Sequence, residues 1–146
     1  MRTVFFFLAI GTESKKCKPY WSYFNGHCYR TTLFNRRGKD ARKECIKNYG
    51  ADLVRIDSAE EQNFLSSLFH PYSGLWIGLK RWRDRKFYWL NGHELPTYTN
   101  WAPGEPNGYD PCIHLYENCV EMNTEKERYW NDLSCNKWLP AICEKK

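Results

Sequence analysis

The segment EPNGYDPCIHLYENC, residues 105–119, gathers carboxylate and amide side chains around a proline and a cysteine. The chain around it is basic, with 22 Lys and Arg against 17 Asp and Glu and a formal net charge of +5. The segment overlaps a longer stretch, residues 95–117, that is rich in Pro, Gly, Asn and Tyr. Because a loop of that length inside a compact domain is usually functional, we expect the binding site to lie here.

Five residues in and beyond this segment carry hard oxygen donors: Glu105, Asn107, Glu117, Asn131 and Asp132. Ca²⁺ takes about six to eight such oxygens in a flexible geometry, whereas zinc prefers nitrogen or sulfur ligands. Three carboxylates held together repel one another unless a cation lies between them. The set therefore predicts a calcium site, and the alternative is a solvated polar loop followed by an Asn-Asp turn.

The length of 146 residues suits a single domain. No stretch approaches the roughly 18 apolar residues that cross a bilayer, so we expect no membrane span. The first residues, MRTVFFFLAIG, combine a positive start with a short apolar run and small residues, as in a secretory signal; a buried N-terminal strand is the alternative. We assign residues 1–11 to a signal peptide and residues 12–146 to the domain, and expect a secreted, extracellular protein.

Seven cysteines also favour an oxidising compartment. No Cys-x-x-Cys occurs, which argues against a zinc ribbon or a redox motif. Because seven is odd, the cysteines cannot all pair within one chain, and spacing alone does not choose among the pairings.

Aromatic residues alternate around Asn25-Gly26, the dipeptide that best fits a type I′ hairpin, so we expect a strand on either side. Further short strands are expected at residues 75–79, 87–90, 119–122, 129–132 and 141–144.

Two helices are also expected. Residues 35–50 place Ala41, Cys45 and Ile46 at helical spacing and end on a glycine. Residues 57–69 begin with a capping box, in which Ser58 accepts from the Glu61 amide and the Glu61 side chain reaches back.

Six short motifs then match a known pattern in order and spacing. They are WIGL at 76–79, NW at 100–101, EPN at 105–107, ENC at 117–119, WND at 130–132 followed by Cys135, and ICE at 142–144. With them the sequence resembles a C-type lectin domain over nearly all of residues 17–143. The resemblance implies an α+β fold with two helices flanking antiparallel sheets, a long loop carrying the calcium site, and disulfides that staple the domain.

The disulfides that the resemblance implies are Cys17–Cys28, Cys45–Cys143 and Cys119–Cys135. Cys112 lies outside this pairing. An intermolecular disulfide through Cys112, which would make a covalent homodimer, is our leading hypothesis; a buried or capped thiol and an exchange in which Cys112 bonds Cys119 are the alternatives.

The same resemblance assigns Glu105, Asn107, Glu117, Asn131 and Asp132 to one Ca²⁺, with the Glu105–Pro106 bond cis. It implies that two vicinal hydroxyls of a sugar complete the ion's shell and bond the same side chains. Glu before the proline and Asn after it resembles binders of mannose, fucose, glucose and N-acetylglucosamine, so glycans on cell surfaces or glycoproteins are the expected partners. Tyr109 is a further candidate, because an aromatic face can pack on a sugar ring.

The chain departs from the family at a second calcium site that is common in relatives. That site needs acids where this chain has Arg81, Gly108 and Asn118, and Asp84 is the remnant. The departure implies one calcium ion rather than two. The loop between Asn107 and Glu117 is also longer than usual, so the resemblance does not predict its course.

Other functions fit less well. The basic run KRWRDRK at 80–86 could meet sulfated glycans, although a solvated loop is the simpler interpretation, and it lacks the features of a nucleic-acid binder. Carboxylates committed to a cation cannot act as the proton donor of a glycosidase, so we expect no enzyme. The serious alternative is a C-type lectin-like module that binds protein, mineral or ice instead of sugar.

Overall fold

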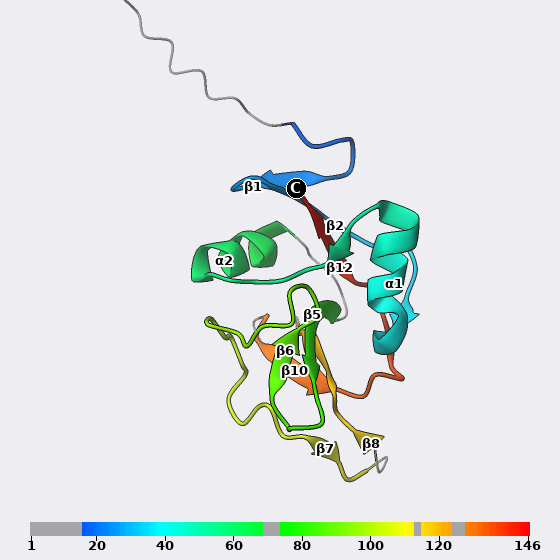
Figure 1. Cartoon of the computed structure of the whole chain (residues 1–146), viewed down its shortest axis with the longest axis vertical. Helices are drawn as coiled ribbons and strands as arrows, with labels where there is room; N and C mark the ends of the chain where they lie inside the picture. Colours follow the sequence, from blue (N-terminus) through cyan, green and yellow to red (C-terminus); the bar gives the residue numbers. More distant parts are fainter. Residues whose placement is uncertain (1–15, 69–73, 113–114, 124–127) are drawn as a thin grey trace, which may run out of the picture.

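The computed structural model of the chain describes residues 16–68, 74–112, 115–123 and 128–146. The predicted signal peptide lies outside these residues. Two four-stranded antiparallel sheets and two helices make up an α+β domain, as predicted (Figure 1). No helix within the described ranges has the length and apolar character needed to cross a membrane.

The first sheet brings the beginning and the end of the described chain together. Its order is β1-β2-β12-β4, with bounds Ser22–Phe24, His27–Thr31, Ile142–Lys145 and Asp52–Leu53. The predicted hairpin joins β1 to β2, and Asn25 (φ 44°) and Gly26 (φ 90°) both take the left-handed conformation that a type I′ turn needs.

The second sheet supports the long loop. Its order is β10-β9-β5-β6, with bounds Trp130–Leu133, Cys119–Met122, Leu75–Arg81 and Phe87–Trp89. In the register of its two central strands, Ile77 pairs with Val120, and both residues are buried. These strands coincide with the predicted ones to within two residues at each end.

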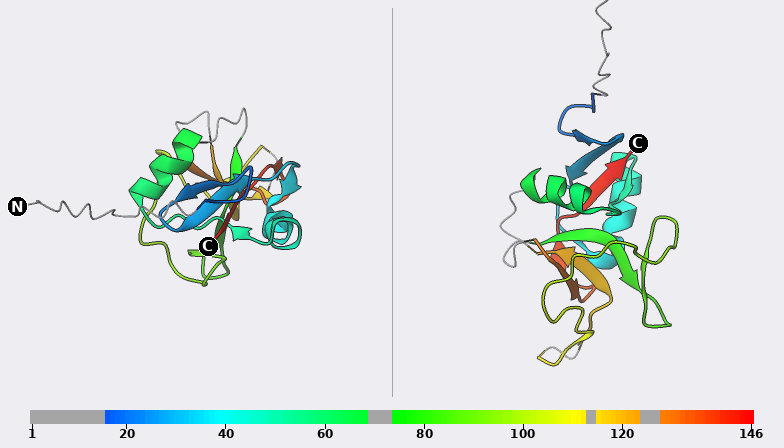
Figure 2. Two further views of the ribbon diagram at one scale, coloured as in Figure 1. Left: turned by 90° about the horizontal axis from the view of Figure 1, so that it is seen from above. Right: turned by 90° about the vertical axis from the view of Figure 1, so that its left-hand side faces the viewer.

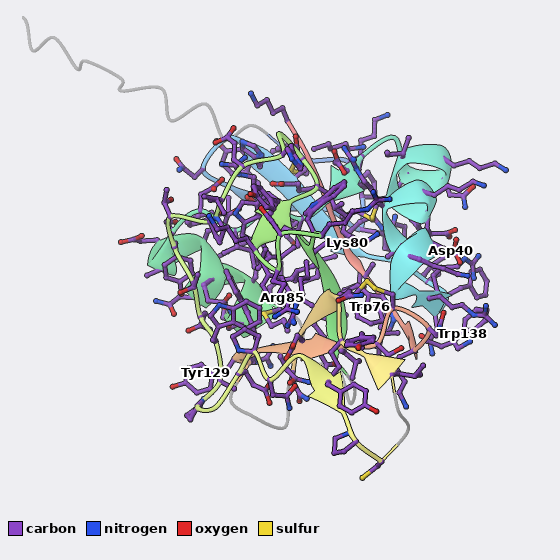
Figure 3. All side chains as sticks on the ribbon, turned by 60° about the horizontal axis from the view of Figure 1, so that its bottom comes forward. Asp40, Trp76, Lys80, Arg85, Tyr129 and Trp138 are labelled. Atoms are coloured by element: carbon purple, nitrogen blue, oxygen red, sulfur yellow. A yellow bond between two sulfur atoms is a disulfide. The ribbon has the colours of Figure 1, made fainter. Side chains whose placement is uncertain are left out.

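Helix α1, Gly38–Tyr49, ends as predicted at Gly50, whose φ of 58° is left-handed. Its buried face consists of Ala41, Glu44 and Cys45, whereas Ile46 is 53% exposed. Ile46 belongs to the helix as expected but lies off this face, because position 46 is about 100° around the helix from position 45. Trp76 packs against this buried face from the second sheet, in the middle of the molecule as Figure 3 shows.

Helix α2, Ala59–Leu68, starts with the predicted cap, and the Glu61 amide donates to Ser58 Oγ at 3.1 Å. The Glu61 side chain reaches one residue further back than a standard capping box, and its Oε2 accepts from the Asp57 amide at 2.9 Å. Leu65 of this helix is fully buried in the main core, between the two sheets.

Three disulfides join these elements with the pairing that the resemblance implied: Cys17–Cys28, Cys45–Cys143 and Cys119–Cys135. Cys112 is exposed and lies outside the three bridges, so the alternative of a buried thiol is wrong. The alternative of a Cys112–Cys119 bond is also wrong, because Cys119 pairs with Cys135.

Among the described residues, five short strands were not predicted: β4 of the first sheet and two further pairs. β3 (Arg36–Arg37) pairs with β11 (Trp138–Leu139) beside α1, and β7 (Tyr109–Asp110) pairs with β8 (Leu115–Tyr116) in the long loop. Two-residue strands carry too little periodicity to be recognised in a sequence. The β7–β8 ribbon lies at the end of the molecule opposite β1 and the C-terminus (Figures 1 and 2).

Candidate metal centre in the long loop

The long loop is tied to β10 by backbone hydrogen bonds. The Trp130 amide donates to Asn100 O at 2.7 Å, and the Ala102 amide donates to Trp130 O at 2.9 Å. A turn follows, in which the Glu105 amide donates to Ala102 O at 2.9 Å. These bonds bring Glu105 next to the strand that carries Asp132.

The β7–β8 ribbon closes the other side of the loop. At its base the Glu117 amide donates to Gly108 O at 3.1 Å, so residues that are nine positions apart meet. The Glu105–Pro106 peptide bond is cis, as the resemblance implied. Glu105, Asn107 and Glu117 are thereby gathered at one end of the second sheet.

The carboxylates of Glu105, Glu117 and Asp132 converge. Each offers an oxygen within 4.8 Å of the other two, and Asp132 is fully buried while Glu117 is 6% exposed. Oxygens that share one Ca²⁺ each lie about 2.3–2.6 Å from it, so they stand at most about 5 Å apart. The observed spacing and the all-oxygen chemistry therefore fit a single calcium ion.

Asp132 also organises the surrounding backbone. Its Oδ1 accepts from the Asn107 amide at 3.0 Å, and its Oδ2 accepts from the Gly108 amide at 2.8 Å and from Arg81 Nη2 at 2.8 Å. Arg81 was noted in the sequence only as a departure from the family. Its contact with an acid 51 positions away has no local sequence signal.

The two predicted amide ligands are placed differently. The backbone of Asn107 lies at the centre, where its amide also donates to Glu105 Oε2 at 3.1 Å, and its side chain is exposed. Asn131 lies between Trp130 and Asp132 on β10, and it is half-buried whereas both neighbours are buried. Its Nδ2 donates to Glu121 Oε1 at 3.1 Å. The structure thus brings the three carboxylates together and holds the Asn131 amide nitrogen on Glu121, a residue that sequence reasoning missed.

Tyr109 stands beside this group on β7. It pairs with Tyr116 across the ribbon, with ring centroids 5.4 Å apart, and the two side chains are 39% and 72% exposed. Because Tyr109 follows Asn107 by two positions and Tyr116 precedes Glu117, both aromatic residues flank the carboxylates.

Asp84, the remnant of the second calcium site, is used inside the β5–β6 hairpin. It accepts from the Lys86 amide at 3.0 Å and from the Tyr88 hydroxyl at 2.6 Å, and the Tyr88 bond is the main reason that the pKa of Asp84 is lowered. No ion is required to explain its position.

Comparisons with known proteins identify the family to which the chain is similar. The model of the lectin C-type domain matches residues 34–145. The human C-type mannose receptor 2 is 37% identical over 132 residues, which cover 89% of this chain but 8% of the receptor. The chain thus spans a small part of the length of the curated relatives that it matches.

Solved structures agree. The carbohydrate-recognition domain of the mouse scavenger receptor C-type lectin superposes with a TM-score of 0.80 at 29% identity, covering 90% of this chain and 98% of that one. The C-type carbohydrate-recognition domain of cow CD23, solved in the presence of a GlcNAc2Man3 oligosaccharide, gives 0.76 at 35% identity, with 89% and 95% covered.

A calcium-independent type II antifreeze protein also superposes, with a TM-score of 0.75 at 24% identity over 89% of this chain and 94% of that one, which shows a shared fold alone. With the family model matching most of its length and the expected motifs, disulfides and sheets in place, the chain belongs to the C-type lectin domain family.

Proposed function

We propose that this domain binds one Ca²⁺ through Glu105, Asn107, Glu117, Asn131 and Asp132, and through it a sugar of the mannose, fucose, glucose or N-acetylglucosamine type. The observation that carries the proposal is the convergence of three carboxylates within 4.8 Å, two of them buried. Bringing such groups together costs free energy through mutual repulsion, and a divalent cation removes most of that cost.

Side chains of the domain would also bind the sugar directly, through hydrogen bonds. A bound calcium ion supplies coordination positions for two neighbouring sugar hydroxyls. Glu105 and Glu117 accept hydrogen bonds from those hydroxyls, and the amide groups of Asn107 and Asn131 donate to them. An amide holds a cation by its oxygen, so Asn131 would turn Oδ1 to the ion while Glu121 holds Nδ2.

Retention on mannose-agarose in calcium, followed by release with EDTA, tests the proposal directly. We expect the protein to elute with EDTA or with free mannose. Passage through the column at saturating calcium, together with no heat of calcium binding in calorimetry, would exclude both the ion and the sugar and favour the alternative of a module that binds protein, mineral or ice.

We propose that the domain is a binding module rather than an enzyme and that it works outside the cell. Three disulfides form and persist in oxidising compartments, which supports an extracellular location. The partners would then be glycans on cell surfaces or on glycoproteins.

The exposed Cys112 supports a disulfide-linked homodimer. Electrophoresis without reductant should show a band of twice the monomer mass that disappears in the Cys112→Ser variant. A single monomer band for the unaltered protein would count against the dimer.

A further inference from the structure

The guanidinium of Arg81 is held by a carboxylate and an aromatic ring beside the candidate metal centre. Its Nη2 lies 2.8 Å from Asp132 Oδ2, and its Cζ lies 4.8 Å from the centroid of the Phe87 ring. The Arg81 side chain is 19% exposed and that of Asp132 is fully buried. A cation held between an aromatic face and a buried carboxylate keeps a fixed place.

Gly108 makes room for this guanidinium. A Cβ at position 108 would lie 2.8 Å from Arg81 Nη1, and Gly108 has a φ of 82° that disfavours other residues. The side chain of Arg81 therefore lies directly against the backbone that follows Pro106.

Arg81 also contacts the opposite side of the loop. Its own amide donates to Asn118 O at 2.8 Å, next to the ligand candidate Glu117. One residue at the end of β5 thus connects the segment after Pro106, the segment after β8, and β10.

The charges agree with this role. Three carboxylates and one guanidinium, −3 and +1, carry −2 together, which a single Ca²⁺ neutralises. We propose that Arg81 is a built-in cation that fixes Asp132 and the Asn107–Gly108 backbone before calcium binds, in place of a second metal ion. The proposal builds on the proposed calcium site and deepens it, because it names the residue that positions that site.

Hydrogen exchange of the Asn107 and Gly108 amides in EDTA tests this role, since both amides donate to Asp132. In the unaltered protein both amides should be protected without metal. Arg81→Met keeps the contact with Phe87 but removes the charge, and it should speed exchange at both amides by roughly tenfold or more, the effect of losing a charge-assisted contact. Arg81→Lys should restore part of the protection.

Two controls accompany the experiment. Arg85→Met removes a charge from the exposed tip of the same hairpin (labelled in Figure 3) and should leave both amides protected. The amides of Thr32 and Val54, which donate to Ala141 O and Ile142 O at the edge of the first sheet, report whether each variant is folded. If Arg81→Met does not fold, Arg81→Gln replaces it.

Unchanged protection of Gly108 in the folded Arg81→Met protein, or equal loss in Arg85→Met, would overturn the proposal. Addition of calcium to Arg81→Met should restore protection, because the ion then orders the loop. The measurement in EDTA involves neither calcium nor sugar, so a failure of the proposed function would appear separately, as no calcium binding in calorimetry of the unaltered protein.

Discussion

Two acidic clusters lie at opposite ends of the domain, and only one of them has the geometry of a metal site. At the loop end, Glu105, Glu117 and Asp132 converge within 4.8 Å. At the other end, Glu61 and Glu144 line a cavity of about 410 Å³ between α2 and the first sheet. Among the described residues, three acids meet at metal-ligand spacing only in the loop cluster.

Protein donors explain the second cluster. Glu61 accepts from the Tyr29 hydroxyl at 2.7 Å and Glu144 from the Arg55 amide at 2.8 Å, while His27 Nδ1 lies 3.3 Å from Glu144 Oε2. Protein donors also contact Asp132 and Glu105 in the loop cluster, but there the three carboxylates converge on a common point. The comparison teaches that the mutual distance of the oxygens, and not the number of acids, distinguishes a cation site.

The largest expected effect comes from removing the central acid of the loop cluster. Asp132→Ala should abolish calcium binding and sugar retention, and should lower the free energy of unfolding by about 3–5 kcal/mol, because Arg81 and two amides lose their buried partner. Urea unfolding in EDTA measures the stability, and calorimetry measures the calcium. A variant as stable as the unaltered protein would show that the contact with Arg81 is weak.

The next effect concerns the cluster at the other end. Burial, opposed by the bond from the Arg55 amide and aided by the charges of Glu61, Asp57 and Asp52, raises the pKa of Glu144 from 4.5 to about 7. The folded protein therefore holds the proton of Glu144 more tightly than the unfolded chain does. The stability that this proton contributes is fully present below pH 4.5 and is lost as the pH rises toward 7. Glu144→Gln should therefore gain stability relative to the unaltered protein over this range, on the order of 3 kcal/mol.

Urea midpoints at several pH values, converted to free energies, test this difference. A gap between the two proteins that does not change with pH would show that Glu144 titrates normally. Sugar binding of Glu144→Gln should be unchanged, since β12, which carries Glu144, runs toward the end of the molecule opposite the β7–β8 ribbon (Figure 1).

A smaller effect is expected from exchanging the acid and the amide around Pro106. Glu105→Gln with Asn107→Asp keeps the number of carboxylates but reverses the positions of acceptor and donor. We expect calcium binding to persist and the preference to shift from mannose toward galactose by about tenfold, or about 1.4 kcal/mol. Competition with the two sugars measures it, and an unchanged preference would count against direct sugar contact by these residues.

The smallest effect concerns the aromatic pair on the ribbon. Tyr109→Ala should weaken sugar binding by a few fold, the scale of one aromatic contact of about 1 kcal/mol, without changing calcium binding. Tyr116→Ala is the matched control, because it removes the more exposed partner of the same pair. Equal affinity in the Tyr109 variant would remove Tyr109 from the site.

The outline of the fold could be predicted because it depends on local signals and ordered motifs. The Asn25-Gly26 hairpin, the Gly50 helix end and the strand at residues 119–122 each follow from a few adjacent residues, and the disulfides follow from the family motifs. The three converging acids were likewise identified from their type and order.

The contacts of the site could not be predicted in the same way. Arg81 with Asp132 and Asn131 with Glu121 are pairs set by sheet register and loop course, and the sequence signal for Arg81 was only the absence of an acid. The β7–β8 ribbon depends on two strands of two residues each, in a loop whose course the resemblance did not predict. Such features depend on tertiary contacts, which single-sequence patterns do not encode.

The hydrogen bond from Glu117 to Gly108 gives the ribbon a closed base. Because the entropy cost of closing a loop rises slowly with its length, peptides of other lengths could replace the segment from Tyr109 to Tyr116 without moving the carboxylates. Under the proposed function, the domain would then serve as a scaffold in which new ribbons are selected. The sugar would hold a glycosylated ligand at the carboxylates, and the grafted peptide would contact the part of the ligand next to the sugar.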